Sequence, residues 1–380
     1  MENGKAIVAH GVDSQFRCWL GGATVLSDAR KASVLVLNYN GCNWLGRCLS
    51  SIRRTEYPNM DVCLIDNGSL DGSVEYVKEN FPDVKIIPHG TNLGFAEGYN
   101  RAMREIKTEY VVLLNNDTEI LNPRWLRSLI ESSKNDHRIA AIACKMRAMN
   151  DPTRIDSVGG MGIPGWRGFV DIGKDELDRG QYDVVGFEPF SFCGGAVLMR
   201  REVFEEAGGF DPKFFMYLED ADLSWRLRLL GYRIGFAPDA VVAHAFSGTA
   251  EAKQVDARKL YYCHRNLLRS ILKNAGSSLR WAVCRYALFS IIMMGGSPLL
   301  LSEPLKSLAL VRAILWNLFN LKDTLLLRRV IQAKRKVSEI EILRVMYPRT
   351  PRYQPSDHPT LRHILDALFG LHHSISDCPR

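Results

Sequence analysis

The chain has 380 residues and a mass of 42.9 kDa, enough for two to three domains and too much for a peptide or a disulfide-stapled scaffold. Hydrophobic residues make up 46% and charged residues 24%, and the mean hydropathy is -0.11, so neither a disordered chain nor a polytopic membrane protein fits. The formal net charge of +7 favours anionic partners, such as phosphorylated substrates, acidic lipid headgroups or nucleic acid.

The cysteines and the first residues indicate the compartment. The chain has nine cysteines and no CxxC pair, which favours a reducing compartment and argues against a zinc knuckle. The apolar stretch near the start is interrupted by His10 and Asp13 and is too short for a secretory signal. We therefore expect a cytoplasmic protein.

From residue 32 onward, short β-branched runs alternate with helical patterns. Such alternation predicts βαβ units, with a parallel sheet and helices on both of its faces. The predicted strands and helices alternate at 33–40, 43–54, 60–69, 73–81, 84–88, 95–106 and 109–120. Ligands of such sheets bind at the carboxyl ends of the strands. Asn, Asp and Ser residues collect at these ends, namely Asn38, Asn40, Asp66, Asn67, Ser69, Asn115, Asn116 and Asp117.

The following segment changes character. Residues 146–190 are Gly-rich and irregular, which predicts long loops or short antiparallel strands over a substrate cleft. A strand and a helix are expected at 190–204. The stretch 218–244 is typical of a helix that ends at Gly231 and is followed by two strands that carry His244.

The last third of the chain combines apolar helices with basic residues. Residues 287–301 carry no charge and 307–321 only Arg312, and each run is too short to span a bilayer. Residues 322–349 carry eight Lys or Arg against three acids. This pattern favours an in-plane attachment to the anionic inner face of the cell membrane. A buried helical hairpin or an oligomer interface is the alternative.

The chain is thereby divided into four parts. They are an N-terminal extension of unknown role (1–31), a catalytic domain (32–270), a helical membrane-associated region (271–345) and a tail (346–380).

Two polar clusters could carry chemistry. The triplet Asn115 to Asp117 follows an apolar strand and suits a hard divalent cation, completed by substrate phosphates, although such a cluster can also be a turn. Glu219 and Asp220 begin a helix, where they could merely cap it. After an apolar and aromatic run they would be partly desolvated, which raises a carboxyl pKa towards that of a general base. Asp222 and Arg226 have the i, i+4 spacing of an ion pair.

Three further features concern anions and metals. His244 could bind a metal as a neutral imidazole, neutralise a diphosphate as a cation, or be a satisfied core residue. Arg265 could bind phosphate through two hydrogen bonds. Gly94 and Gly98 open a helix whose backbone amides could receive a phosphate. This segment is neither a GxGxxG motif nor a P-loop, so kinases, GTPases and nicotinamide-dependent enzymes lose their main support.

The order of the motifs resembles that of inverting glycosyltransferases of family 2, particularly the rhamnosyltransferase-like branch. The resemblance covers residues 33–268 and rests on SVLVLNYNG, LIDNGSLDGS, NLGFAEGYN, VVLLNNDTEI, FCGGAVLMRREVFEEAGGFDPKFFMYLEDADLSWRLRLLGY and VVAHAFSG. It implies an α/β GT-A fold, a Rossmann-like mixed and mainly parallel sheet flanked by helices, with a helical C-terminal extension.

The resemblance also implies roles for individual residues. Asp220 would be the general base and Glu219 would hydrogen-bond the acceptor. Asp117, as the last carboxylate of the family's DxD motif, and His244 would hold Mg²⁺ or Mn²⁺ on the diphosphate. The first position of that motif is Asn115 here, a departure from the pattern. The donor would be bound by Asn38 and Asn40 at the base, Asp66 at the nucleoside, Asn92 and Gly94 near the nucleotide, and Asn115, Asn116, Asp117 and Arg265.

The implied reaction is an in-line displacement with inversion. The expected donor is a nucleotide-diphospho-sugar, with dTDP-L-rhamnose first. The acceptor would be a hydroxyl of a polyprenol-linked or other cell-envelope glycan at the inner membrane surface, and no nucleic acid is expected as a partner. The alternatives are a UDP-linked hexose, N-acetylhexosamine or galactofuranose donor, and a non-catalytic sugar-nucleotide-binding scaffold.

Overall fold

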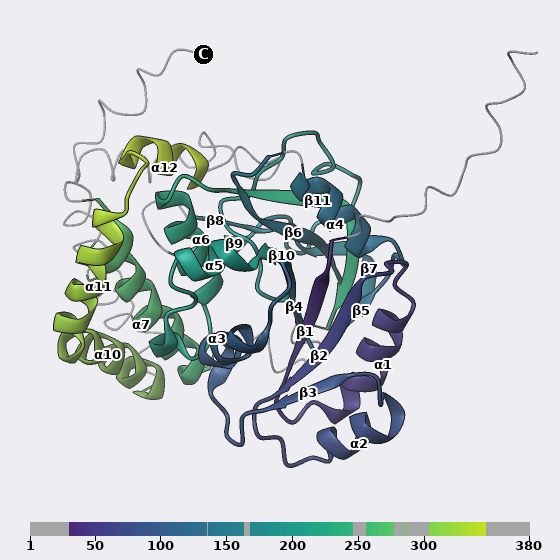
Figure 1. Ribbon diagram of the computed structural model, residues 1–380. Coiled ribbons are helices and arrows are strands. Elements are labelled where there is room, and N and C mark those ends of the chain that lie inside the picture. The colour runs from purple at the N-terminus through teal and green to yellow at the C-terminus, as the bar shows by residue number, and fades with distance from the viewer. Residues whose placement is uncertain are drawn as a thin grey trace, which may run out of the picture.

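The computed structural model describes residues 30–134, 136–162, 168–245, 256–276, 284, 288 and 304–346 (Figure 1). The predicted tail beyond Met346, nearly all of the N-terminal extension and most of the apolar run 287–301 lie outside the described residues. The elements of the sheet domain are β1 (Ala32–Asn38), α1 (Cys42–Arg53), β2 (Met60–Asp66), α2 (Ser73–Asn80), β3 (Lys85–Pro88), α3 (Gly94–Glu105), β4 (Tyr110–Asn115), β5 (Thr118–Ile120), α4 (Trp125–Lys134), β6 (Ile139–Ala148), β7 (Asp151–Ser157), β8 (Gly160–Gly162), β9 (Phe169–Asp171), β10 (Ala196–Arg200), α5 (Arg201–Glu206), the 3-10 turn η1 (Pro212–Phe214), α6 (Glu219–Leu229) and β11 (Arg233–His244). The helices that follow are α7 (Ala257–Asn274), α10 (Pro304–Phe319), α11 (Leu321–Ala333) and α12 (Glu339–Met346).

A nine-stranded mixed sheet forms the centre of the molecule. Its strand order is β3-β2-β1-β4-β10-β6-β11-β5, and β7 pairs with β6. Strands β1 to β4 run parallel, as the alternation of strands and helices predicts, whereas β10 is antiparallel to both β4 and β6. Asn38 pairs with Asp66, and Leu37 pairs with Asn115. The polar residues that end β1, β2 and β4 therefore meet at one edge of the sheet.

Alternating side chains of the central strands enter two separate cores. Val34 and Val36 of β1 pack with α1, α2 and α4, whereas Leu35 packs with α3, α5 and α6. Successive side chains of a strand point to opposite faces, so a strand that is apolar and buried at nearly every position, such as β1, requires helices on both faces. The buried strand pattern thus explains the α/β layering that Figure 1 shows.

The irregular segment and the last strand both depart from simple pairing. Residues 146–190 contain the short antiparallel pair β8 and β9, as predicted. The two strands expected to carry His244 form one long strand, β11, instead. Its pairing with β6 jumps between Ala237 and Val241. The residue after Ala237 is Pro238, which has no backbone N–H to donate. This accounts for the gap in the pairing with β6, although β11 itself continues to His244.

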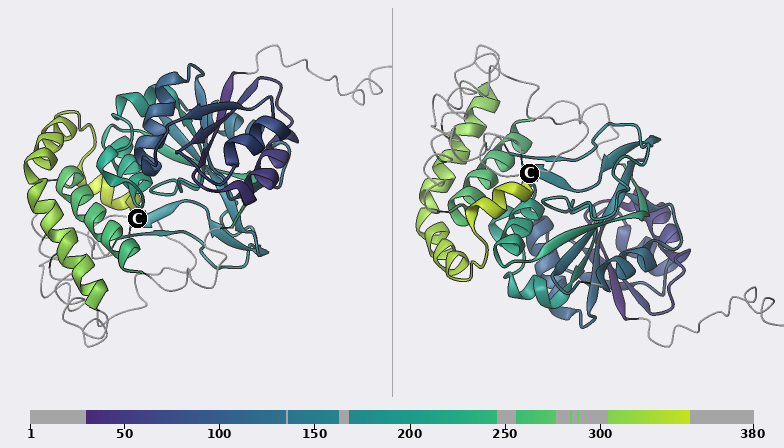
Figure 2. Two further views of the ribbon diagram at one scale, coloured as in Figure 1. Left: turned by 90° about the horizontal axis from the view of Figure 1, so that it is seen from below. Right: turned by 90° about the horizontal axis from the view of Figure 1, so that it is seen from above.

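The C-terminal helices gather on one side of the sheet domain (Figure 2). Helices α10 and α11 both pack against α7, which packs against α6. Ile342 and Met346 of α12 enter a third core with Trp225 and Ile271. Helix α7 runs across the predicted boundary at residue 270. Within the described parts of the chain, no helix is both long enough and apolar enough to cross a membrane.

Candidate active site

The loops after β1 and β2 form a preorganised polar rim. Asp66 is buried, and its Oδ2 accepts hydrogen bonds from the backbone amides of Gly68 and Ser69, both at 3.1 Å. The side-chain amide of Asn38 donates to Ser69 Oγ at 3.0 Å. Asn40 has a positive φ of 49°, and its Oδ1 accepts from the amide of Leu70 at 2.8 Å. Three of the predicted donor-binding residues are thus held in one hydrogen-bonded loop pair.

A second contact joins this rim to the end of β4. Asn116 Nδ2 donates to Asn38 Oδ1 at 2.6 Å. Gly41 lies directly beneath this bond, because a Cβ at this position would come within 1.9 Å of Asn116 Nδ2. Residue 41 must therefore be glycine if the two asparagines are to meet.

The start of α3 is closed by protein groups. The amide of Gly94 donates to Asn92 Oδ1 at 2.9 Å, and the amide of Phe95 donates to the carbonyl of Phe215 at 2.6 Å. Gly94 has a φ of +75°, and a Cβ there would lie 2.4 Å from the Phe215 carbonyl oxygen. In the structure these amides are bonded within the protein rather than open to a phosphate. The loop before α6 is thereby attached to α3.

Asp117 and His244 converge although they come from different strands. His244 ends β11 and pairs with Thr118, and its Nε2 lies 3.4 Å from Asp117 Oδ1. Its Nδ1 lies 2.7 Å from Asp156 Oδ2, and Asp156 also forms an ion pair with Lys174. Burial alone would lower the pKa of His244, but the hydrogen bonds to Asp117 and Asp156 outweigh it and raise this pKa to about 9.

This pair fits the predicted divalent cation. One carboxylate oxygen and one imidazole nitrogen face each other, and Asp117 is partly open to solvent. Among the described residues, no group of three or more His, Cys, Asp or Glu could hold a metal. The remaining ligands would therefore have to be diphosphate oxygens and water, as is common for Mg²⁺.

The candidate base lies at the first turn of α6. The half-buried Asp220 accepts hydrogen bonds from the amides of Gly194 at 3.0 Å and Ala221 at 2.7 Å. Burial raises its pKa against these two hydrogen bonds, as the sequence predicts. Glu219 is buried, and its Oε2 has no hydrogen-bond partner in the described part of the chain. Burial and the adjacent Asp220 raise the pKa of Glu219 well above its usual value.

A glycine pair connects the base to the metal pair. The Gly194 amide binds Asp220, whereas the carbonyl of Gly195 accepts from the backbone amide of Asn115 at 3.0 Å. A Cβ on Gly195 would lie 3.5 Å from Asn115 Nδ2 and 3.6 Å from His244 Cε1. The backbone at 194–195 thus binds Asp220 through Gly194 and lies next to Asn115 and His244 at Gly195. The sequence contains this pair within a motif, but gives no role for it.

Asp171 lies near Asp220 and Asp156 and was not among the predicted residues. It accepts a hydrogen bond from Ser157 Oγ at 2.7 Å. The surrounding protein, together with the carboxylates of Asp220 and Asp156, raises its pKa to about 6. Asp156, Lys174 and Asp171 all come from the irregular segment, where no local pattern distinguishes a site residue from a loop residue.

Two predicted residues behind the crevice have structural partners. Asp222 forms the predicted ion pair with Arg226, at 3.0 Å, and a second ion pair with Lys273, at 3.1 Å. Arg265 is buried, and its guanidinium donates to the carbonyls of Lys213 and Phe214, both at 2.7 Å. The Arg265 guanidinium also lies over the Trp316 ring at 4.5 Å. None of these partners belongs to the predicted nucleotide-binding set.

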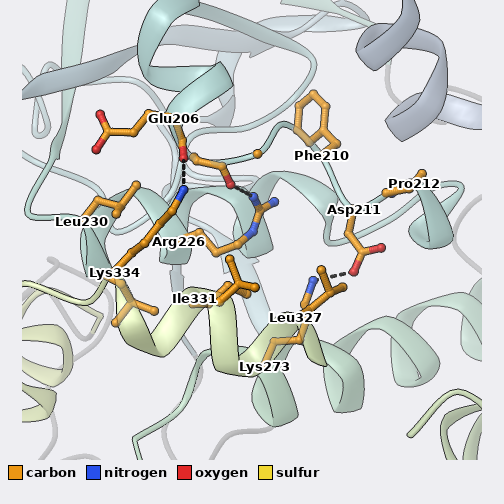
Figure 3. A pocket seen from close by; sticks show the side chains of 14 residues that line it. Glu206, Phe210, Asp211, Pro212, Arg226, Leu230, Lys273, Leu327, Ile331 and Lys334 are labelled. Carbon is orange, nitrogen blue, oxygen red and sulfur yellow. Dashed lines mark hydrogen bonds and ion pairs between the residues drawn. The ribbon is translucent and has the colours of Figure 1, made fainter. Parts of the chain in front are cut away.

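A cavity of about 160 Å³ lies apart from this site, between α6, α7 and α11 (Figure 3). None of the predicted site residues lines it. Its cations Arg226, Lys273 and Lys334 bond to the Ala207 carbonyl, the Asp211 carboxylate and the Glu206 carbonyl. The cavity therefore marks the junction between the C-terminal helices and the sheet domain.

The strand order, with polar residues collected at the ends of β1, β2 and β4, is the arrangement expected of the GT-A fold. A model of the glycosyl transferase family 2 matches residues 33–208, so this part of the chain is a domain of that family. Over 236 residues it is 28% identical to the N-acetylglucosaminyl-diphospho-decaprenol L-rhamnosyltransferase of Mycobacterium tuberculosis. That match covers 56% of this chain and 75% of the relative. The predictions of the family and of an enzyme are confirmed.

Two solved structures share the fold. A mannosyltransferase from Pyrobaculum calidifontis in complex with GDP-Man and Mn²⁺ has a TM-score of 0.50 and 18% identity, over 77% of this chain and 88% of that one. The TarS 1-349 structure from S. aureus in complex with UDP-GlcNAc has a TM-score of 0.50 and 17% identity, over 83% of this chain and 90% of that one. At these identities the likeness extends to the fold.

Proposed function

We propose that the enzyme transfers a sugar, with dTDP-L-rhamnose as the first donor to consider, to a hydroxyl of a polyprenol-linked or other cell-envelope glycan, with inversion. The arrangement around Gly194 and Gly195 carries this proposal. Gly194 binds Asp220, a carboxylate with a raised pKa, and the adjacent Gly195 lies beside His244, which faces Asp117. The similarity to a rhamnosyltransferase with a decaprenol-linked acceptor supports the choice of donor and acceptor.

In the proposed mechanism, Asp220 removes the proton of the acceptor hydroxyl as that oxygen attacks the anomeric carbon. The Gly194 amide holds one oxygen of Asp220, which leaves the carboxylate fixed relative to the crevice. Glu219, with an unpartnered buried oxygen, is suited to orient the acceptor through a hydrogen bond. Asp66, Asn38 and the residues around them would hold the nucleoside. A divalent cation held by Asp117 and His244 would neutralise the charge of the leaving diphosphate.

A donor panel tests this proposal. Release of nucleoside diphosphate would be measured from dTDP-, UDP- and GDP-sugars with an acceptor extract, with Mg²⁺ or Mn²⁺ and again with EDTA. We expect turnover of dTDP-rhamnose that requires metal and that falls by about 10²- to 10⁴-fold in Asp220→Asn, while donor binding stays unchanged. If only a UDP-sugar were turned over, that UDP-sugar would take the place of dTDP-rhamnose as the proposed donor. Equal turnover in Asp220→Asn would refute the role of the base.

We further propose that α10 rests on the inner membrane surface. Leu305, Leu308, Leu315, Leu318 and Phe319 of this helix are all exposed, and Phe319 is 84% exposed. Their spacing places them along one side of the helix, while Leu310 and Ala313 pack inward. A row of exposed apolar side chains next to a basic segment has the character of an interfacial helix on anionic lipid.

Vesicle flotation tests the membrane contact. The intact protein should float with vesicles that contain anionic phosphatidylglycerol and less with neutral vesicles. Leu308→Glu with Phe319→Glu should abolish flotation. The matched control is Val185→Glu, because Val185 is fully exposed in the sheet domain. Equal flotation of the α10 variant and the control would refute the contact and favour another partner for this face.

A further inference from the structure

The predicted metal ligand His244 is held by an aspartate that comes from a distant part of the chain. Asp156 lies on β7, 88 residues before His244, and is only 5% exposed. Its Oδ2 lies 2.7 Å from His244 Nδ1, while its Oδ1 forms an ion pair with Lys174. Both oxygens of Asp156 are therefore engaged, one by the imidazole and one by the lysine.

This contact decides which ring nitrogen faces the crevice. An ionised carboxylate only accepts hydrogen bonds, so Nδ1 of His244 must carry the hydrogen. The other nitrogen, Nε2, is then the atom that faces Asp117 at 3.4 Å. A histidine that binds metal through one nitrogen commonly donates its other N–H to a carboxylate, which fixes both the orientation and the tautomer of the ring.

We propose that Asp156 is a positioning residue that presents His244 Nε2, beside Asp117, to the divalent cation of the donor diphosphate, and that Lys174 holds Asp156 in place. This inference rests on the proposed function, because the cation is part of it. It also gives the irregular segment 146–190 a second task. In addition to its predicted place over the substrate cleft, that segment would supply the support of the metal pair.

Asp156→Asn is the sharpest test. The asparagine has the same shape, but its amide group can donate to Nδ1, which shifts the hydrogen to Nε2 and blocks metal binding there. Mn²⁺ would be titrated into the full-length protein with dTDP or UDP, and followed by electron paramagnetic resonance. We expect the Mn²⁺ affinity to fall 10- to 100-fold in Asp156→Asn and to recover in part in Asp156→Glu. Pulsed measurements should show coupling of a histidine nitrogen to Mn²⁺ only in the wild type and the Glu variant.

Two controls separate positioning from general damage. Asp178→Asn removes another aspartate of the same segment, which pairs with Lys145 at 3.3 Å and Arg147 at 2.6 Å, and it should leave the Mn²⁺ affinity unchanged. His244→Gln should abolish the nitrogen coupling. Unchanged affinity and coupling in Asp156→Asn would overturn the proposal. A wild type that transfers sugar without any nitrogen coupling would also overturn it, while the proposed transfer would stand.

Discussion

Lys273→Met probes the network that anchors the catalytic helix. Lys273 is 1% exposed, and its Nζ lies 2.6 Å from Asp211 Oδ2 and 3.1 Å from Asp222 Oδ2. Asp222 follows Glu219 and Asp220 within the first turn of α6. The lysine therefore joins α7 both to this helix and to the loop that precedes it.

The expected magnitude follows from what the substitution leaves behind. Breaking a buried ion pair by removing one partner costs about 3–5 kcal/mol. Asp211 keeps Arg269 at 2.7 Å, and Asp222 keeps Arg226 at 3.0 Å. Because neither carboxylate is left alone, we expect a loss near the lower end, about 3 kcal/mol of unfolding free energy.

Urea unfolding at pH 7 measures this loss. The matched control is Lys31→Met, since Lys31 pairs with Asp61 at 2.8 Å but both side chains are about half exposed. The control should lose at most about 1 kcal/mol. A loss below about 1 kcal/mol in Lys273→Met, or an equal loss in both variants, would refute the argument from burial.

The same variant has a definite pH dependence. Burial opposes ionisation of Asp211, but Lys273 and Arg269 outweigh it and lower its pKa below the usual range. Stability from a lowered carboxyl pKa is present above the unfolded pKa and is lost as the pH falls. The difference between wild type and Lys273→Met should therefore persist down to the unfolded carboxyl pKa of about 4 and shrink only as the pH falls below it.

Three further predictions concern the crevice. Gly41→Ala should raise KM for the donor at least several-fold, with a smaller effect on kcat. The Cβ of the new alanine would displace Asn116 from Asn38. An unchanged KM in steady-state kinetics would contradict this prediction. Because the pKa of Asp220 is raised, the acid limb of the kcat/KM profile should lie above the usual aspartate pKa. Activity should fall as the pH drops through this limb. A limb at or below the usual aspartate pKa would exclude Asp220 as the titrating base. In EDTA, the folded protein should lose up to about 3 kcal/mol of stability between pH 6.5 and 9. The raised pKa of His244 stabilises the folded state below the pKa of the unfolded state, and this stabilisation is lost as the pH rises through the folded-state pKa of about 9. His244→Gln should lack this loss, and a variant that keeps it would assign the titration to another group.

Local sequence patterns determined the layers of the fold. The runs in β1 and β4 are apolar at nearly every position, which requires a strand buried on both faces. Helical spacing alone also predicted the Asp222 and Arg226 pair, because residues four apart lie on one face of a helix. Motif order gave the candidate residues Asp117, Asp220 and His244, since these lie at the ends of predicted elements.

Contacts between distant segments were decided by tertiary packing alone. Asp156 meets His244 across 88 residues, and Lys273 meets Asp222 across 51. No periodicity relates such positions, because their proximity depends on how β7 pairs with β6 and how α7 packs against α6. Arg265 illustrates the converse case. Its sequence context is compatible with a phosphate ligand, yet packing directs its guanidinium to backbone carbonyls. The sequence thus determined which chemical groups are available, and the packing of segments far apart in the chain decided which of them meet.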